Sequence, residues 1–102
     1  MMRMVCREGL YGYIDDDGRT VLEPQYLYAE SFFENRAVVQ VRDGGFGVID
    51  KRGRFVVEPR YAMVAMTEEG HFRVMDDRGL VGELGYTGEE IIPLGTELQL
   101  ND

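Results

Sequence analysis

Residues Gly44–Tyr61 read GGFGVIDKRGRFVVEPRY, and the pattern in this stretch decides the fold. It matches an earlier stretch, Gly9–Tyr26, which reads GLYGYIDDDGRTVLEPQY. A third and less regular version starts at Gly79 and reads GLVGELGYTGEEIIPLGT. The three versions follow one another at a spacing of 35 residues. A fixed period of this size is the signature of a repeat architecture.

The repeat also includes a strand-like segment before each of these stretches. This segment recurs at residues 2–6, 37–41 and 72–76. We therefore divide the chain into three copies, residues 2–36, 37–71 and 72–102, of which the third is truncated. A chain of 102 residues is enough for one domain. We expect a single repeat domain over residues 1–102.

The middle copy has the pattern of three short strands joined by tight turns. These strands are Ala37–Arg42, Phe46–Asp50 and Arg54–Glu58. Between the last two, Asp50 and Gly53 occupy the first and fourth positions preferred in a type I turn. Pro59 ends the third strand, because proline cannot donate to a strand ladder. We expect an all-β fold in which each copy is a short antiparallel three-stranded meander.

A glycine lies inside the second strand of every copy, at Gly12, Gly47 and Gly82. Such a glycine weakens a strand unless a neighbouring group needs the space. We expect an aromatic ring to fill it, and the candidates are Tyr26 and Tyr61. These tyrosines closely follow the recurring prolines, Pro24 and Pro59. Apolar residues such as Ile49 lie on both faces of the strand, so we expect it to be covered on both sides.

Composition and charge limit the classes of partner. The chain has 19 acidic and 11 basic residues, a net charge of −8. Nucleic acids and anionic membranes both select basic surfaces, so we expect neither as a partner. Another protein with a basic surface is favoured, although acidity also promotes solubility. The start has no apolar signal segment, and the single cysteine, Cys6, cannot form an intramolecular disulfide, so we expect a cytoplasmic protein.

The two connectors between copies, residues 27–36 and 62–71, are the least alike parts of the repeat. We expect a helical turn in the first, which reads LYAESFFENR. Divergent residues on one side of a repeat array commonly carry binding specificity. We therefore select a candidate interaction surface from the connectors; the alternative that their apolar side chains only cover the core stays open. The surface comprises Tyr28, Phe32, Phe33, Met63, Met66, Glu68 and Glu69.

The recurring residues resemble the WG repeat family of bacterial proteins. That family's pattern is an aromatic–Gly pair, an aromatic with Ile-Asp, a turn with Gly and Lys or Arg, two aliphatics, Pro and Tyr. The first copy matches it at Tyr11–Asp15, Gly18-Arg19, Val21-Leu22, Pro24 and Tyr26. The second copy matches it 35 positions later, apart from Val48 at the second aromatic position. The resemblance implies an all-β repeat module used in protein–protein contacts, and it implies no catalytic residues.

The chain departs from the family pattern in two ways. Tyr11, Phe46 and Val81 stand where the family has its name-giving tryptophan. The third copy has Gly85 in place of the aspartate, and its proline, Pro93, comes one position early. We therefore expect the third copy to act as a cap.

Residues that suggest a metal or catalytic site have simpler interpretations. The run Asp15–Gly18 begins like a calcium loop, but its twelfth position is Tyr26 rather than the bidentate glutamate of an EF-hand. We expect it to be a turn. Cys6 and His71 are the only residues of their types, too few for a transition-metal site. We expect Cys6 to be a small core residue, His71 to be a solvated turn residue, and no cofactor or metal.

We expect a non-enzymatic protein–protein interaction module. One alternative is a small acidic inhibitor of the immunity type that neutralises a basic protein. A second is an enzyme with an unrecognised carboxylate site, because 19 acids always allow some close pair. A homodimer through an exposed edge strand also stays open, since residues 2–6 form the leading edge of the array.

Overall fold

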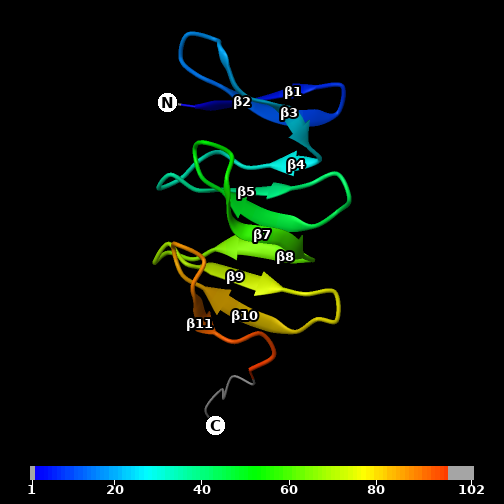
Figure 1. The fold of residues 1–102 in the computed structure, drawn as a ribbon, viewed down its shortest axis with the longest axis vertical. Helices are drawn as coiled ribbons and strands as arrows, with labels where there is room; N and C mark the ends of the chain where they lie inside the picture. The colour runs from blue at the N-terminus through cyan, green and yellow to red at the C-terminus, as the bar shows by residue number, and fades with distance from the viewer. Residues whose placement is uncertain (1, 97–102) are drawn as a thin grey trace.

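The structure of the protein, a computed structural model, describes residues 2–96 of the chain. Within this range the chain forms eleven β-strands and no helix (Figure 1). The strands are β1 (Arg3–Arg7), β2 (Leu10–Ile14), β3 (Thr20–Tyr26), β4 (Tyr28–Ala29), β5 (Ala37–Gln40), β6 (Phe46–Ile49), β7 (Phe55–Tyr61), β8 (Met63–Met66), β9 (Phe72–Met75), β10 (Val81–Leu84) and β11 (Glu90–Ile92). The end of the third copy, residues 97–102, lies outside the described residues.

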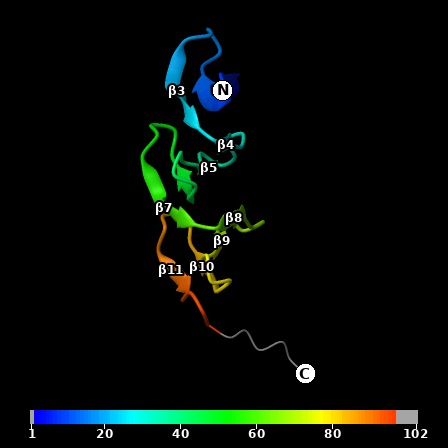
Figure 2. The same ribbon diagram turned by 90° about the vertical axis from the view of Figure 1, so that its right-hand side faces the viewer.

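Three antiparallel sheets are stacked along the long axis of the molecule (Figure 1). The first sheet has the order β1-β2-β3, the middle sheet β4-β5-β6-β7, and the last sheet β11-β10-β9-β8. Each copy therefore supplies one three-stranded meander, which confirms the all-β repeat fold. In the side view, β3, β7 and β11 line one side of the stack, and β4 and β8 lie toward the other (Figure 2).

The connectors contribute a fourth strand to each following sheet. After β3 ends at Tyr26, β4 begins at once and pairs with β5 of the next copy; β8 follows β7 in the same way. The amide of Leu27 already donates to the carbonyl of Gln40, at 2.8 Å. The helical turn expected in residues 27–36 is therefore wrong, because the backbone groups of this segment bond to the ladder of the next copy.

The turn between β6 and β7 has the predicted type I pattern. The amide of Gly53 donates to the carbonyl of Asp50 at 2.9 Å, and Gly53 has a φ of 81°. The Asp50 carboxylate accepts the amides of Arg52 at 2.9 Å and Arg54 at 3.0 Å. Asp15 accepts two backbone amides in the same way. The run of aspartates after β2 is thus a turn, as expected.

Two apolar cores lie between the sheets. The core between the first and middle sheets contains Tyr13, Tyr26, Ala29, Ala37, Val39 and Ile49. The core between the middle and last sheets contains Val38, Val48, Val57, Tyr61, Val64, Phe72 and Val74. The central strand β6 supplies Ile49 to one core and Val48 to the other, and both side chains are fully buried. This strand is therefore covered on both faces, as predicted.

A backbone bulge, and not an aromatic ring, occupies the space beside Gly47. Phe46 pairs with Tyr61 and Val48 pairs with Val57, so three residues of β7 lie opposite Gly47 alone. A Cβ atom on Gly47 would lie 2.5 Å from the carbonyl oxygen of Val57. The expected role of Tyr61 beside the glycine is therefore wrong, because this side chain is buried in the core between the sheets.

The first copy has the same bulge, and the third copy has a similar close approach of backbone beside its glycine. A Cβ on Gly12 would lie 2.5 Å from the Leu22 carbonyl oxygen, and one on Gly82 would lie 2.8 Å from that of Ile92. In the first copy the bulge contains Pro24, and Tyr26 is again buried in the core. The recurring glycine and proline thus form one structural unit, because the bulge that carries the proline needs the missing side chain of the glycine.

The first strand is displaced by one residue relative to the repeat period. A two-residue turn, Glu8-Gly9, joins β1 to β2 where the middle copy has a three-residue loop. Cys6 therefore pairs with Tyr11, as Gln40 pairs with Phe46. Cys6 is exposed, so the prediction of a core cysteine is wrong. The strand β1 has a single partner, β2, which makes it the predicted leading edge.

Candidate functional site

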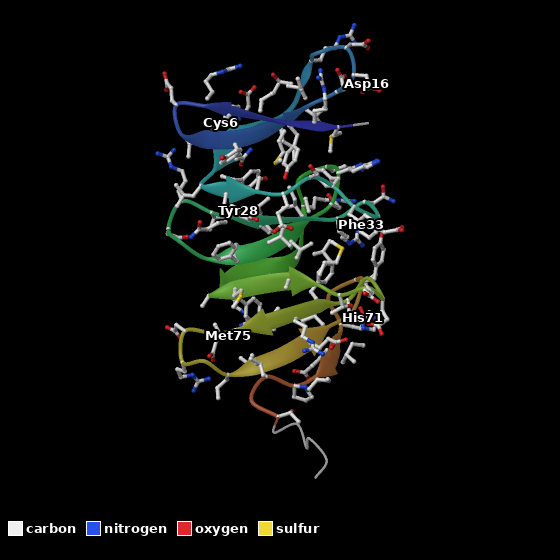
Figure 3. The ribbon with its side chains drawn as sticks, turned by 180° about the vertical axis from the view of Figure 1, so that it is seen from behind. Cys6, Asp16, Tyr28, Phe33, His71 and Met75 are labelled. Atoms are coloured by element: carbon white, nitrogen blue, oxygen red, sulfur yellow. The ribbon has the colours of Figure 1, made fainter. Side chains whose placement is uncertain are left out.

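The structure divides the candidate interaction surface between two edges of the stack. Tyr28 and Phe33 lie on opposite edges (Figure 3). Met63 starts β8 and pairs with Met75, which lies on the same edge as Tyr28 (Figure 3). Phe32 is half-buried and its ring contacts that of Tyr13, at a centroid distance of 4.8 Å. The surface predicted from the connectors is therefore not one continuous patch.

Several of the predicted residues do come together on the Phe33 edge, where the two connectors meet. Phe33, Met66 and Glu68 line one shallow hollow, and exposed Glu69 directly follows Glu68. We call this site the Phe33 hollow, and its lining residues are Glu30, Ser31, Phe33, Met66, Thr67 and Glu68. The side chain of Phe33 is 58% exposed. An exposed apolar ring and two acidic residues, Glu30 and Glu68, therefore line the same hollow.

A tight turn presents Phe33. The amide of Phe33 donates to the carbonyl of Arg36 at 2.8 Å, and the reverse bond measures 3.0 Å. The two residues between them, Glu34 and Asn35, both have positive φ, 53° and 65°. Two successive residues in this conformation are typical of a type I′ turn. The ring of Phe33 therefore projects from a defined two-residue turn.

A residue of the third copy holds this turn in place. The guanidinium of Arg36 lies 3.8 Å from the ring centroid of Tyr86, and its Nε donates to the Tyr86 carbonyl at 3.0 Å. The Tyr86 hydroxyl donates in return to the carbonyl of Glu34 at 2.7 Å. These contacts link residues 50 and 52 positions apart in the sequence. The turn is thus fixed before any partner binds.

The sequence analysis missed Tyr86 and Arg36. Tyr86 occupies a turn position that carries Asp16 in the first copy and Lys51 in the second. The sequence could have indicated Tyr86, because it is an aromatic residue at a turn position where the other two copies have a charged residue. The sequence could not indicate that Tyr86 contacts Arg36, because the two residues belong to different copies.

Glu30 links the Phe33 hollow to the core beneath it. Its carboxylate accepts the hydroxyl of Tyr28 at 2.7 Å, and its carbonyl accepts the hydroxyl of Tyr13 at 2.7 Å. Burial raises the pKa of Tyr13 well above its ordinary value, so this phenol stays a neutral donor. The backbone of the hollow is therefore anchored to a fully buried side chain.

His71 is not the solvated turn residue that the sequence suggested. It is half-buried, and its Nδ1 lies 2.8 Å from Oε2 of Glu83. Nε of Arg73 lies 3.4 Å from the other oxygen of the same carboxylate. The hydrogen bond with His71 holds the pKa of the Glu83 carboxyl below its ordinary value. Glu83 is thus a charged group that contacts both the His71 ring and the Arg73 guanidinium.

No group of three or more His, Cys, Asp and Glu side chains in the described part of the chain is placed to hold a metal ion. None of the elements in residues 2–96 is a helix long and apolar enough to cross a membrane.

Comparison with known proteins gives one match. A family model described as "WG containing repeat" matches residues 11–44 and 46–78, which is most of the first two copies. The matched segments start one period apart and end before the irregular part of the third copy. No curated protein and no solved structure matches the chain.

Proposed function

Because the chain belongs to the WG-containing repeat family, we propose that it is a noncatalytic module that binds another protein. The observation that carries this proposal is the Phe33 hollow. An exposed aromatic ring shares this hollow with Glu30 and Glu68, and it lies on a turn that Tyr86 fixes in advance. A rigid aromatic anchor is the kind of residue that dominates binding energy at protein interfaces. A fixed loop also reduces the entropy lost on binding.

The chemistry of the hollow favours a partner segment that carries arginine or lysine beside an apolar side chain. Glu30 and Glu68 line the hollow and Glu69 adjoins it. A cation placed over the Phe33 ring would gain a cation–π contact in addition to these carboxylates. The net charge of −8 adds a long-range attraction for a basic protein. We propose a basic protein surface as the ligand of this hollow.

A capture experiment with matched variants tests the proposal. The tagged chain, the Phe33→Ser variant and a Phe55→Ser control are exposed to extract of the native host and washed at low or high salt. Phe55 is also an exposed phenylalanine but lies on β7, away from the hollow. We expect one basic protein that wild type and Phe55→Ser retain at low salt and that Phe33→Ser loses. Equal retention by both variants, or binding that salt does not weaken, would contradict the proposal.

The same acidic surface also suits the narrower role of an inhibitor that blocks a basic partner. If the captured protein is an enzyme, its activity is measured with and without an excess of the chain. Loss of activity with wild type, and not with Phe33→Ser, supports the inhibitor role. Full activity in the complex supports an adaptor instead.

A further inference from the structure

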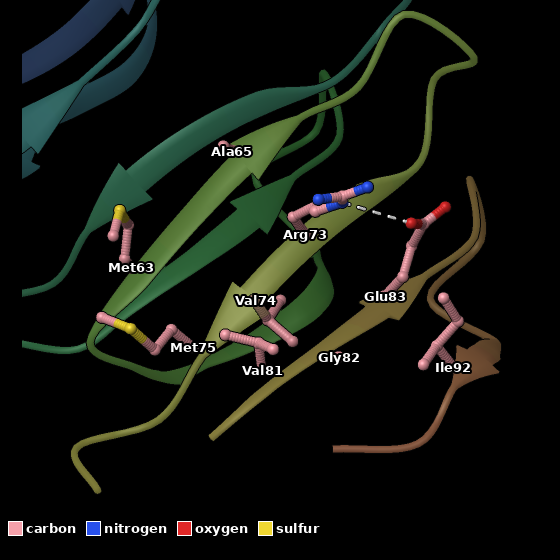
Figure 4. A pocket seen from close by; sticks show the side chains of 9 residues that line it. All are labelled: Met63, Ala65, Arg73, Val74, Met75, Val81, Gly82, Glu83 and Ile92. Carbon is pink, nitrogen blue, oxygen red and sulfur yellow. Dashed lines mark ion pairs between the residues drawn. The ribbon is translucent and has the colours of Figure 1, made fainter. Parts of the chain in front are cut away.

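The last sheet has a face on which no sheet of residues 2–96 packs, and this face is separate from the Phe33 hollow. The residues on this face come from all four strands: Met63, Ala65, Arg73, Met75, Val81, Glu83 and Ile92. They line a hollow of about 170 Å³ (Figure 4). Met63 is 50% exposed and Val81 is 42% exposed. The face is therefore largely apolar and open to a partner.

The repeat shows what covers this face elsewhere in the chain. In the middle sheet, the equivalent pairs are Val38 with Val48 and Val48 with Val57, and all three are buried under the last sheet. In the last sheet, Arg73 pairs with Glu83, and Glu83 with Ile92, at the same register. This face is thus the one on which a following sheet packs in the earlier copies.

The opposite end of the stack carries the complementary face. In the middle sheet, Ala37 pairs with Ile49, and both are buried against the preceding sheet. The pair at this register in the first sheet is Arg3 with Ile14. Arg3 therefore lies on the outer face of the first sheet, which no sheet in residues 2–96 covers. Val5 and Arg7 share that face, because side chains alternate along β1.

The two ends differ in charge. The strand β1 contains two arginines and no acid. The outer face of the last sheet carries one acid, Glu83, and one base, Arg73, whose Nε lies 3.4 Å from the Glu83 carboxylate. Two first-sheet faces would bring their arginines together and repel each other, whereas the last-sheet face receives the first-sheet face without that repulsion.

We propose that this chain associates head to tail with a second copy of itself. The outer face of the first sheet in one copy packs on the outer face of the last sheet in the next and so continues the stack. Val5 and Ile14 then meet the apolar hollow of Met63, Met75 and Val81. The contact is heterologous, so it does not close on itself and each added copy exposes a new end. The average mass consequently grows with concentration instead of stopping at a dimer.

The test is sedimentation velocity of the full chain over a wide concentration range, with variants at each end. The head variant is Arg3→Glu with Arg7→Glu, and the tail variant is Val81→Gln, which makes the apolar hollow polar without adding a charge opposite the arginines. All three residues are exposed, so the fold is retained, which circular dichroism verifies. The matched control is Leu27→Gln, because Leu27 is also 42% exposed but lies between the first and middle sheets.

Wild type and the control are expected to exceed the 11.7 kDa monomer mass increasingly as concentration rises. Each end variant alone is expected to associate at least about tenfold more weakly. An equimolar mixture of the head and tail variants retains one intact head and one intact tail. It is therefore expected to form a species of twice the monomer mass and nothing larger.

Four outcomes would overturn the proposal. One is a wild-type chain that stays monomeric at every concentration. Another is a tail variant that still dimerises, which would indicate contact between two β1 edges. The third is a head variant that still dimerises, which would indicate contact between two last sheets. The fourth is loss of association with Leu27→Gln, since that residue lies at neither end.

Discussion

The replacement of Gly47 by alanine tests the central structural unit of the repeat, the bulge of β7 opposite a glycine of β6. The added Cβ would lie 2.5 Å from the carbonyl oxygen of Val57 and 2.9 Å from N and Cα of Pro59. These atoms belong to the backbone, so no rotation of a side chain relieves the contact. The strand β7 has to move away from β6, and it carries Val57 and Tyr61 out of their positions in the core.

The expected cost follows from the size of this clash. Adding a methyl group to a well-packed site commonly destabilises a protein by about 1–3 kcal/mol. The upper part of that range, about 2–3 kcal/mol, applies because the contacts are with backbone. For a domain of this size, each kcal/mol lowers the melting temperature by about 4–8 °C. We expect Gly47→Ala to melt roughly 10–20 °C below wild type in a calorimetric scan.

Two further glycines calibrate the result. At Gly82 the nearest atom to an added Cβ is the Ile92 carbonyl oxygen at 2.8 Å, so Gly82→Ala is expected to cost less than Gly47→Ala. At Gly85 the nearest atoms belong to the carboxylate of Glu89, which can swing away, so Gly85→Ala is expected to cost below about 1 kcal/mol. A Gly47→Ala protein that melts within about 2 °C of wild type, or together with Gly85→Ala, would refute the account of the bulge.

Three other side chains yield predictions. Ile49→Ala removes a fully buried side chain and is expected to lower the free energy of unfolding by about 2–5 kcal/mol in urea titrations; an unchanged midpoint would contradict this. Tyr13→Phe leaves the Glu30 carbonyl without its donor, at a cost of about 1–3 kcal/mol. Because burial raises the pKa of Tyr13 above the ordinary 10.0, the stability that its neutral form contributes is complete below that pH and is lost as pH rises. The variant should therefore lose less stability than wild type between about pH 8 and pH 11, and an equal loss would count against the buried phenol. The pKa of Glu83 is lowered, so its contribution is present above its ordinary value of 4.5 and is lost at lower pH. Wild type is expected to have a higher melting temperature than Glu83→Gln at about pH 6, and this difference is expected to shrink as the pH falls below 4.5. A difference that stays constant in acid would contradict the contacts of Glu83 with His71 and Arg73.

The features that could be predicted from the sequence are those with local causes. The turn at Asp50 depends on an aspartate that accepts the amides two and four residues later and on a glycine that accepts positive φ. All of these residues lie within five positions of one another, so the sequence alone specifies the turn. The period of 35 residues then transfers the same turn to Asp15. The meanders follow, because short turns leave consecutive strands no other partner.

The connector 27–36 could not be predicted in this way. Its residues Tyr28 and Ala29 form β4 because Gln40 and Val39 of the next copy are there to pair with them. The aromatic residues that suggested a helical turn serve instead as packing partners, as Phe32 does for Tyr13. The Phe33 hollow has the same origin, since its lining comes from both connectors. Local propensity contains no information about such contacts between copies.

The one-residue displacement of β1 shows how a small local feature decides the chemistry of a whole face. The repeat period aligns Arg3 with Val38, which is fully buried between the middle and last sheets. At that register, Arg3 would face the core beside Tyr13, and an unpaired buried charge costs several kcal/mol. The shorter turn at Glu8-Gly9 pairs Met4 with Tyr13 instead and moves Arg3 to the outer face. In a strand, a slip of one residue moves every side chain to the other face. The same slip therefore places Val5 and Arg7 beside Arg3, and it produces the basic face through which we propose that one copy stacks on the next.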